Sequence, residues 1–223
     1  MYPFVNILST KRLPANLKHF LLNADFGILE ADFIETTSQP FVFTTLHDNL
    51  IITSQNAVES LLKNNALETI KTKKCFCVGS KTKEMLEKNQ FTVVASTDYA
   101  KELANIICEK HKNESFTFFS GNLRFDTLPM ALQNTGITFN EIQVYTTRLT
   151  PVAIEGNYNG VLFFSPSGVE SYLKKNKLTD QICFCIGTTT AKALDNQTKK
   201  IVLAHKPTIE NTIIQCINYY KTR

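Results

Sequence analysis

The sequence predicts an α/β protein of two similar lobes, each with a parallel sheet flanked by helices. Short β-rich apolar runs alternate with helical stretches along the chain, which is typical of parallel α/β folds. Long phrases also occur twice, in the same order. With 223 residues, of which 43% are hydrophobic, the chain can build one large domain or two smaller domains with proper cores.

One repeated segment, which we call segment B, begins with a short apolar run that leads into a helical pattern. "IITSQNAVESLL" starts at Ile51 and "LFFSPSGVESYL" at Leu162. In both copies a polar residue stands three positions before a glutamate, Asn56 in the first copy and Ser167 in the second. This spacing predicts capping boxes at the helix starts.

Segment B continues with a second apolar run, one glycine, a group of hydroxyls and another helical pattern. "CFCVGSKTKEML" starts at Cys75 and "CFCIGTTTAKAL" at Cys183, a separation of 183 − 75 = 108 residues. A third matched pair follows, in which "FTVVASTDYAKELANII" aligns with "IVLAHKPTIENTIIQCI". Each phrase predicts a strand followed by a helix.

The other repeated segment, segment A, precedes or follows these phrases. "ILSTKRLPANLKHFLLNADFGILEADFIETT" from Ile7 resembles "FFSGNLRFDTLPMALQNTGITFNEIQVYTT" from Phe118. Ser9 aligns with Ser120, and both copies end in a pair of threonines. The chain thus has the order A, B, A, B, and two copies of each fit two α/β lobes.

The two Cys-x-Cys pairs are interpreted as core residues. In an extended strand Cys75 and Cys77 point to one face and Phe76 to the other. Central strands of a helix-covered parallel sheet are buried on both faces, where small apolar thiols pack well. The two Cys-x-Cys pairs lack the C-x₂₋₄-C loop spacing that is usual in zinc sites, so no metal is expected.

Hydroxyl side chains gather where the predicted strands end. Ligands of open α/β sheets bind beyond the carboxyl ends of the strands, near free N–H groups of helix N-termini. One such row in each lobe is expected to line a cleft whose N–H and O–H donors suit carboxylates. The alternative is that these residues are only helix caps. The row includes Ser54, Thr82, Ser120, Ser165, Ser167, Thr189 and Thr190.

Composition and missing motifs restrict the remaining function classes. The net charge of +4 is mild, and no cluster of Lys or Arg predicts nucleic-acid binding. No phosphate-binding glycine loop and no G-x-S-x-G motif is present. No signal peptide or segment of about 20 apolar residues is visible, so a cytoplasmic protein with reduced cysteines is expected, without membrane contact.

In order and spacing, these phrases resemble the uroporphyrinogen-III synthase (HemD) family over almost the whole chain, from Ile7 to Ile217. The phrases that carry the resemblance are "IITSQNAVESLL", "CFCVGSKTKEML", "FFSGNLRFDTLP", "IQVYTT", "FFSPSGVESYL" and "CFCIGTTTAKAL". The resemblance implies that the first segment A packs with the last segment B. The implied domains are 1–36 with 149–223 (lobe I) and 37–148 (lobe II), joined by a two-segment hinge that lets the lobes open and close.

The resemblance also implies the reaction. Members cyclise hydroxymethylbilane, a linear tetrapyrrole with eight carboxylates, to uroporphyrinogen III. Water is lost, and ring D is inverted through a spiro intermediate. No cofactor is required, which makes the expected enzyme a cofactor-free lyase. The bilane itself is the expected partner, handed over by hydroxymethylbilane synthase, and the enzyme is expected to be a monomer.

Residue roles follow from the same resemblance. Tyr145 in "VYTT" corresponds to the family's tyrosine beside the cleft and is the candidate acid for departure of the hydroxyl. Lys11, Arg12 and Arg124 follow the segment A strands and are candidate carboxylate contacts, together with the hydroxyl row. Some relatives have a basic residue at the position of Asn56, and some have a lysine at the position of Cys183. Since this chain has no charge at either position, main-chain N–H groups are expected to contribute more to carboxylate binding there.

Two other function classes remain open from the sequence. A non-catalytic bilobal module that binds a small polyanion would share the hinge and the lack of an acid–base pair. A sugar-phosphate enzyme of two α/β lobes would need an acidic catalytic residue, and none can be recognised. Tight binding of a linear tetrapyrrole without turnover would favour the binding module, and turnover of a phosphate ester would favour the sugar-phosphate enzyme.

Overall fold

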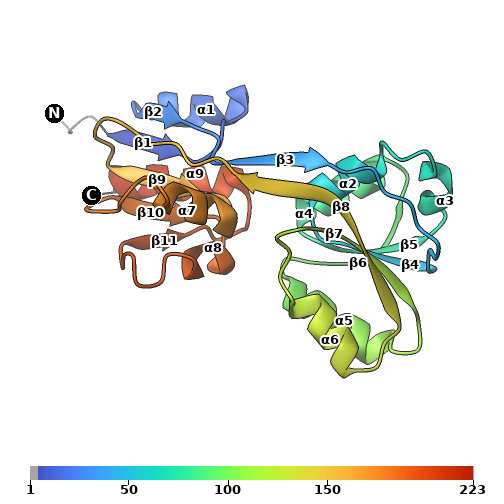
Figure 1. Cartoon of the computed structure of the whole chain (residues 1–223). Coiled ribbons are helices and arrows are strands. Elements are labelled where there is room, and N and C mark those ends of the chain that lie inside the picture. Colours follow the sequence, from blue (N-terminus) through green and yellow to red (C-terminus); the bar gives the residue numbers. More distant parts are fainter. Residues whose placement is uncertain (1–4, 223) are drawn as a thin grey trace. The chain divides into compact units, whose positions relative to one another are not determined.

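The computed structural model describes residues 5–222 and contains two sheets of mainly parallel strands covered by helices (Figure 1). The α/β fold class is thus confirmed. The chain divides into two compact units. One, lobe I, combines the segment up to Glu35 with the segment from Arg148 onward, and the other, lobe II, is Thr36–Thr147. Each boundary lies one residue from the predicted range.

Lobe I contains a five-stranded sheet in the order β11-β10-β9-β1-β2. Neighbouring strands of this sheet pair in parallel. The strands are β1 (Asn6–Ser9), β2 (Gly27–Glu30), β9 (Gly160–Phe163), β10 (Ile182–Cys185) and β11 (Ile201–Leu203). The helices are α1 (Ala15–Leu22), α7 (Pro166–Leu173), α8 (Thr188–Lys192) and α9 (Ile209–Lys221).

Lobe II contains a six-stranded sheet in the order β3-β8-β7-β4-β5-β6. The strands are β3 (Ile34–Ser38), β4 (Asn49–Ile52), β5 (Lys74–Val78), β6 (Thr92–Thr97), β7 (Phe116–Gly121) and β8 (Phe139–Leu149). The helices are α2 (Gln55–Leu61), α3 (Leu67–Lys71), α4 (Ser80–Lys88), α5 (Ala100–Lys110) and α6 (Thr127–Asn134). Leaving out β3, the strand order repeats that of lobe I, with β8-β7 in the place of β2-β1.

The sheet order shows how the repeats combine. In lobe I, β1 from the first segment A lies beside β9 from the last segment B, with Ile7 opposite Gly160. In lobe II, β7 from the second segment A lies beside β4 from the first segment B. The neighbouring strands β3 and β8 carry the chain between the lobes and run in opposite directions (Figure 1).

Alternating burial in the central strands assigns each helix pair to one face of its sheet. In lobe II, Cys75 and Cys77 pack with residues of α2 and α4, whereas Phe76 packs with residues of α5 and α6. In lobe I, Cys183 and Cys185 face α7 and α8. The predicted core role of these cysteines is confirmed, because all four are fully buried.

These buried thiols predict a selective alkylation pattern. Burial raises the pKa of Cys75, Cys183 and Cys185 to about 12, so thiolate is scarce at neutral pH. Cys108 in α5 is partly exposed. Iodoacetamide at pH 8, followed by mass spectrometry, should label Cys108 in the native protein, and all six cysteines after unfolding in guanidinium. Fast native labelling of Cys75 or Cys183 would contradict this packing.

Candidate functional site

The hydroxyl row follows the carboxyl ends of parallel strands in each lobe, where α/β proteins bind ligands. In lobe II, Ser54 comes two residues after β4, and Gly121 ends β7. In lobe I, Thr10 directly follows β1, and Ser165 lies two residues after β9. Because neighbouring strands are parallel, each lobe presents these positions along one edge of its own sheet.

Tyr145 lies in β8 and packs at this edge of lobe II. Its half-buried ring contacts the hydrophobic cluster that contains Phe119 and Val144. The phenol oxygen accepts a hydrogen bond from Ser54 Oγ over 3.1 Å. Ser54 Oγ also accepts a hydrogen bond from the Ala57 N–H, at 3.1 Å. Ser54 therefore ties the tyrosine to the start of α2.

Gly121 provides the space for the Tyr145 ring. The register of β7 and β8 shifts between Ser120 and Gly121, and this irregularity brings Gly121 opposite Tyr145. A Cβ atom at residue 121 would lie 2.3 Å from Cε2 and Cζ of that ring, closer than any real contact. Glycine is thus the residue that permits this ring position.

Asn122 fixes the part of β8 that follows Tyr145. Its Oδ1 accepts from the Thr147 N–H at 2.7 Å, and its Nδ2 donates to the Thr147 carbonyl at 3.1 Å. This pair of bonds continues the β7–β8 pairing past the irregularity. Neither Gly121 nor Asn122 was among the predicted site residues. The signal was visible in the repeat, because Gly121 stands where the first copy of segment A has Thr10.

The predicted capping boxes are wrong. The N-cap of α2 is Ser54 and that of α7 is Ser165, whose Oγ atoms accept from Ala57 N–H and Gly168 N–H. Asn56 and Ser167 lie inside the first turn, two residues later. The backbone is extended at both serines, and Pro166 occupies the first helical position of α7, so the helices begin earlier than the spacing predicted.

The predicted hydroxyls differ in their access to a ligand. In lobe I, Ser165 Oγ and Ser167 Oγ are 3.1 Å apart and both side chains are half-buried. Thr189 is exposed. Thr82, Ser120 and Thr190 are only 4%, 2% and 1% exposed, so their hydroxyls are not presented to solvent in this structure.

Arg124 is neutralised within lobe II. Its Nε and Nη2 donate to Glu141 at 2.7 and 2.9 Å, and its Nη1 donates to Asp126. Ser120 Oγ donates to the same Glu141 carboxylate at 2.6 Å. Burial raises the pKa of Glu141, but the hydrogen bonds from Arg124 and Ser120 outweigh that effect and keep it below its usual value. This carboxylate was not predicted from the sequence.

The two basic residues of lobe I are more open to solvent. Arg12 forms an ion pair with Asp32 in which the atoms are 3.5 Å apart, and its side chain is 82% exposed. The Arg12 N–H also donates to the Asp32 carboxylate at 2.8 Å. Lys11 is exposed. These two residues follow β1, as predicted.

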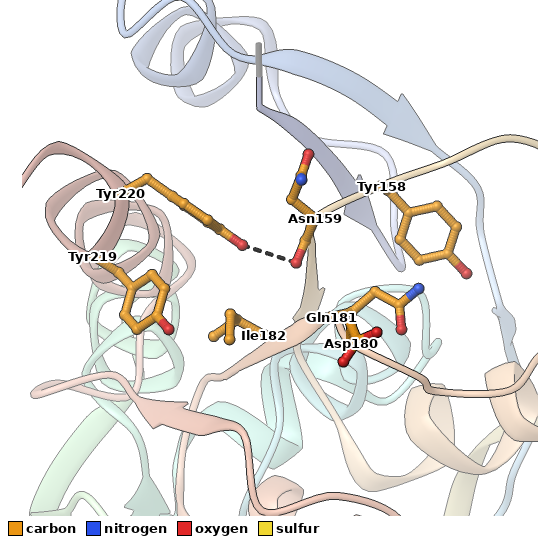
Figure 2. Close-up of a pocket in the computed structure, with 7 residues that line it drawn as sticks. All are labelled: Tyr158, Asn159, Asp180, Gln181, Ile182, Tyr219 and Tyr220. Carbon is orange, nitrogen blue, oxygen red and sulfur yellow. Dashed lines mark hydrogen bonds between the residues drawn. The ribbon is translucent and has the colours of Figure 1, made fainter. Parts of the chain in front are cut away.

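A pocket of about 340 Å³ lies elsewhere in lobe I (Figure 2). It opens beside Asn159 and Gln181, which precede β9 and β10, so it belongs to the amino ends of the strands. Its polar groups are engaged with one another and with neighbours, since Tyr220 Oη donates to the Asn159 carbonyl and Asp180 accepts from Lys200. None of the predicted site residues lines it. Its lining consists of Tyr158, Asn159, Asp180, Gln181, Ile182, Tyr219 and Tyr220.

Within residues 5–222, no group of three or more His, Cys, Asp or Glu side chains is arranged to hold a metal ion. Over the same residues, no helix has the length and apolar character needed to cross a membrane.

Comparison with known proteins gives one consistent family. A family model described as uroporphyrinogen-III synthase HemD matches residues 23–214. The uroporphyrinogen-III synthase of Chlorobaculum parvum is 26% identical over 174 residues, which are 68% of this chain and 71% of that protein.

Solved structures share the fold. The crystal structure of uroporphyrinogen-III synthetase from Helicobacter pylori matches with a TM-score of 0.72 and 21% identity over 97% of this chain and 100% of its own. A mutant uroporphyrinogen III synthase from Thermus thermophilus matches with a TM-score of 0.69 and 14% identity, covering 98% and 99% of the two chains. Since the family model spans most of the sequence, the chain belongs to the uroporphyrinogen-III synthase HemD family and is an enzyme of porphyrin and haem biosynthesis.

Proposed function

We propose that the protein cyclises hydroxymethylbilane to uroporphyrinogen III as a hydro-lyase, with loss of water and inversion of ring D through a spiro intermediate. The observation that carries the proposal is the family match over residues 23–214. The geometry around Tyr145 supplies a phenol beside a strand end, where this chemistry needs a proton donor.

Tyr145 is proposed as the general acid. As the bond between carbon and the terminal hydroxyl breaks, the phenol transfers its proton to the leaving oxygen, and water departs. The electron pair of the adjacent pyrrole nitrogen forms the azafulvene, and the nitrogen's proton returns to the phenolate. The last pyrrole ring then attacks through its substituted carbon. The protein's contribution is to orient this reactive chain toward one of two competing closures.

The carboxylates of the bilane are proposed to bind the accessible donors at the strand ends. These are the half-buried Ser165 and Ser167, the exposed Thr189 and Lys11 of lobe I, and the half-buried Asn56 of lobe II. Arg12 would exchange its Asp32 partner for a substrate carboxylate. Burial argues against direct contact by Thr82, Ser120 and Thr190, and its two acidic partners argue against contact by Arg124.

We further infer a monomeric, cofactor-free enzyme of the cytoplasm that receives the bilane from hydroxymethylbilane synthase. Six free cysteines agree with a reducing compartment. The lability of the bilane, which closes on its own, favours such a hand-over. Its products also allow a direct test of the reaction.

The first expected outcome concerns the product isomer. Freshly made hydroxymethylbilane, incubated with the purified protein and then oxidised for chromatography, should give uroporphyrin III well above the spontaneous background. Without protein, the uninverted isomer I should dominate. If the protein yields isomer I at the spontaneous rate, the proposed reaction is wrong, and tight binding without turnover would indicate a binding module instead.

Replacing Tyr145 by phenylalanine should lower kcat about 10- to 100-fold, because one proton donor is lost while the ring remains. The melting temperature should stay close to that of the wild type, since Phe fills the same space beside Gly121. An unchanged kcat in Tyr145→Phe would mean that the phenol has only a packing role.

The two neighbouring threonines of α8 form a matched pair. Thr189→Ala should raise KM about two- to tenfold with kcat unchanged, the size expected for one neutral hydrogen bond to substrate. Thr190→Ala should leave KM within about twofold, because the Thr190 side chain is buried and its hydroxyl is not presented to a ligand. A larger rise in KM in Thr190→Ala than in Thr189→Ala would contradict the proposal that Thr189 is the threonine that contacts the substrate.

A further inference from the structure

Ser54 was predicted as a carboxylate contact, but its hydroxyl is already occupied. The oxygen accepts the Ala57 N–H at 3.1 Å, and the hydrogen is donated to the phenol oxygen of Tyr145 at 3.1 Å. A serine hydroxyl has one hydrogen to donate. That hydrogen is directed at the tyrosine and is not available to a carboxylate of the substrate.

The direction of this bond has a consequence for Tyr145. A phenol that accepts from Ser54 keeps its own hydrogen for another partner. The phenol is also fixed in place, because Gly121 lies against the ring and the Asn122–Thr147 pair holds the strand two residues further on. The Tyr145 ring is therefore fixed at its oxygen and on one face, and the phenol O–H is free to donate a hydrogen bond to the substrate.

We propose that Ser54 and Gly121 are positioning residues that hold the Tyr145 phenol with its hydrogen directed away from Ser54, ready for donation to the substrate. This inference rests on the proposed function of Tyr145 as the general acid. It assigns Ser54 a role through the tyrosine and not through a substrate carboxylate. It also gives Gly121 a function that the predicted site residues did not include.

The other lobe offers an internal comparison. Ser165 stands at the same place in the second segment B and caps α7 through Gly168 N–H. Its further hydroxyl contact is Ser167 Oγ at 3.1 Å. Both serines cap a helix, but of the two, the serine of lobe II is the one bonded to a tyrosine. Capping alone thus does not account for the Ser54–Tyr145 bond.

Three substitutions at Ser54 separate its two hydrogen bonds. Ser54→Thr keeps the cap and the donated hydrogen, so kcat should stay within about twofold of the wild type. Ser54→Ala removes both and should lower kcat about two- to tenfold, the loss of one hydrogen bond. Ser54→Asp keeps the cap, but its carboxylate draws the phenol hydrogen to itself, and kcat should fall further than in the alanine variant.

A control variant isolates the cap. Thr208 caps α9 in lobe I by accepting from the Asn211 N–H at 3.1 Å, the same distance as at Ser54. Within residues 5–222, its hydroxyl makes no hydrogen bond to a tyrosine. Thr208→Ala should lower the melting temperature to a similar extent as Ser54→Ala, with kcat unchanged. Stability loss alone would then not explain the effect at Ser54.

Coupling to Tyr145 provides the decisive measurement. In a Tyr145→Phe background, Ser54→Ala and Ser54→Asp should change kcat by less than about twofold, because there is no phenol left to position. KM should be nearly unchanged throughout, which a lost carboxylate contact would not allow. If Ser54→Asp retains full kcat, or if the alanine loss persists without the phenol, the positioning role is wrong.

The carbon-13 signal of Tyr145 tests the Ser54–Tyr145 hydrogen bond without any measurement of the proposed reaction. In protein labelled with carbon-13 at tyrosine Cζ, the Tyr145 signal is identified by its absence in Tyr145→Phe. It should shift in Ser54→Ala and in Gly121→Ala, and stay in place in Thr208→Ala. No shift in Ser54→Ala would overturn the bond itself, whereas failure to form isomer III would overturn only the reaction.

Discussion

Parallel pairing of one strand from each repeated segment, at the centre of each sheet, is the constraint on which the remaining structure depends. β1 pairs with β9, and β7 pairs with β4, although the partners are far apart in sequence. β4 and β9 are buried at all four positions, since helices cover both faces. In lobe I the paired strands β1 and β9 are separated along the chain by the whole of lobe II. The chain must therefore leave lobe I near Glu35 and return near Arg148.

The same pairing decides which residues become neighbours. Because β4, β7 and β8 are adjacent and the pairs β4–β7 and β7–β8 are parallel, the ends of β4 and β7 bring Ser54 and Gly121 beside Tyr145 of β8. The irregularity after Ser120 then turns Tyr145 over Gly121. In lobe I the corresponding position to Gly121 is Thr10, whose hydroxyl donates to the Leu162 carbonyl. The same position in the repeated fold thus makes room for a tyrosine ring in lobe II and carries a hydrogen bond between a side chain and the backbone in lobe I.

The sequence predicted the fold well because its signals were repeated and local. In the Cys-Phe-Cys phrase of lobe II, the cysteines pack on one face of the sheet and the phenylalanine on the other, as the alternation of side chains along a strand predicts. The helix starts were less accurate, since Ser54 and Ser165 were passed over for a spacing that began two residues later. The N-cap depends on where the backbone leaves the extended conformation, and the four-residue pattern does not contain that information.

The site was predicted only in part, for a physical reason. Residue type indicated hydroxyls at the strand ends, but it did not distinguish the exposed Thr189 from the buried Thr190 beside it. Arg124 was predicted from its charge and its place after a segment A strand, whereas Glu141, 17 residues away, pairs with it. Burial and pairing are tertiary properties. Gly121 could have been noticed in the sequence as a glycine that replaces Thr10 of the first copy directly after the matched serines.

The balance of charge around Tyr145 also bears on the proposed reaction. Positive charge develops on the substrate as its hydroxyl departs, and a fixed unpaired cation nearby would oppose that step. Two unit charges 4 Å apart repel by ~4 kcal/mol at the effective dielectric near a protein surface, which is almost three orders of magnitude in rate. In lobe II, Arg124 follows the strand beside Tyr145, but Glu141 and Asp126 offset its charge. Under the proposed function, a neutral donor such as the Asn56 amide can bind a substrate carboxylate at this edge without raising the barrier to ionisation. The contacts of Arg124 with Glu141 and Asp126 thus leave no unpaired cation at this position.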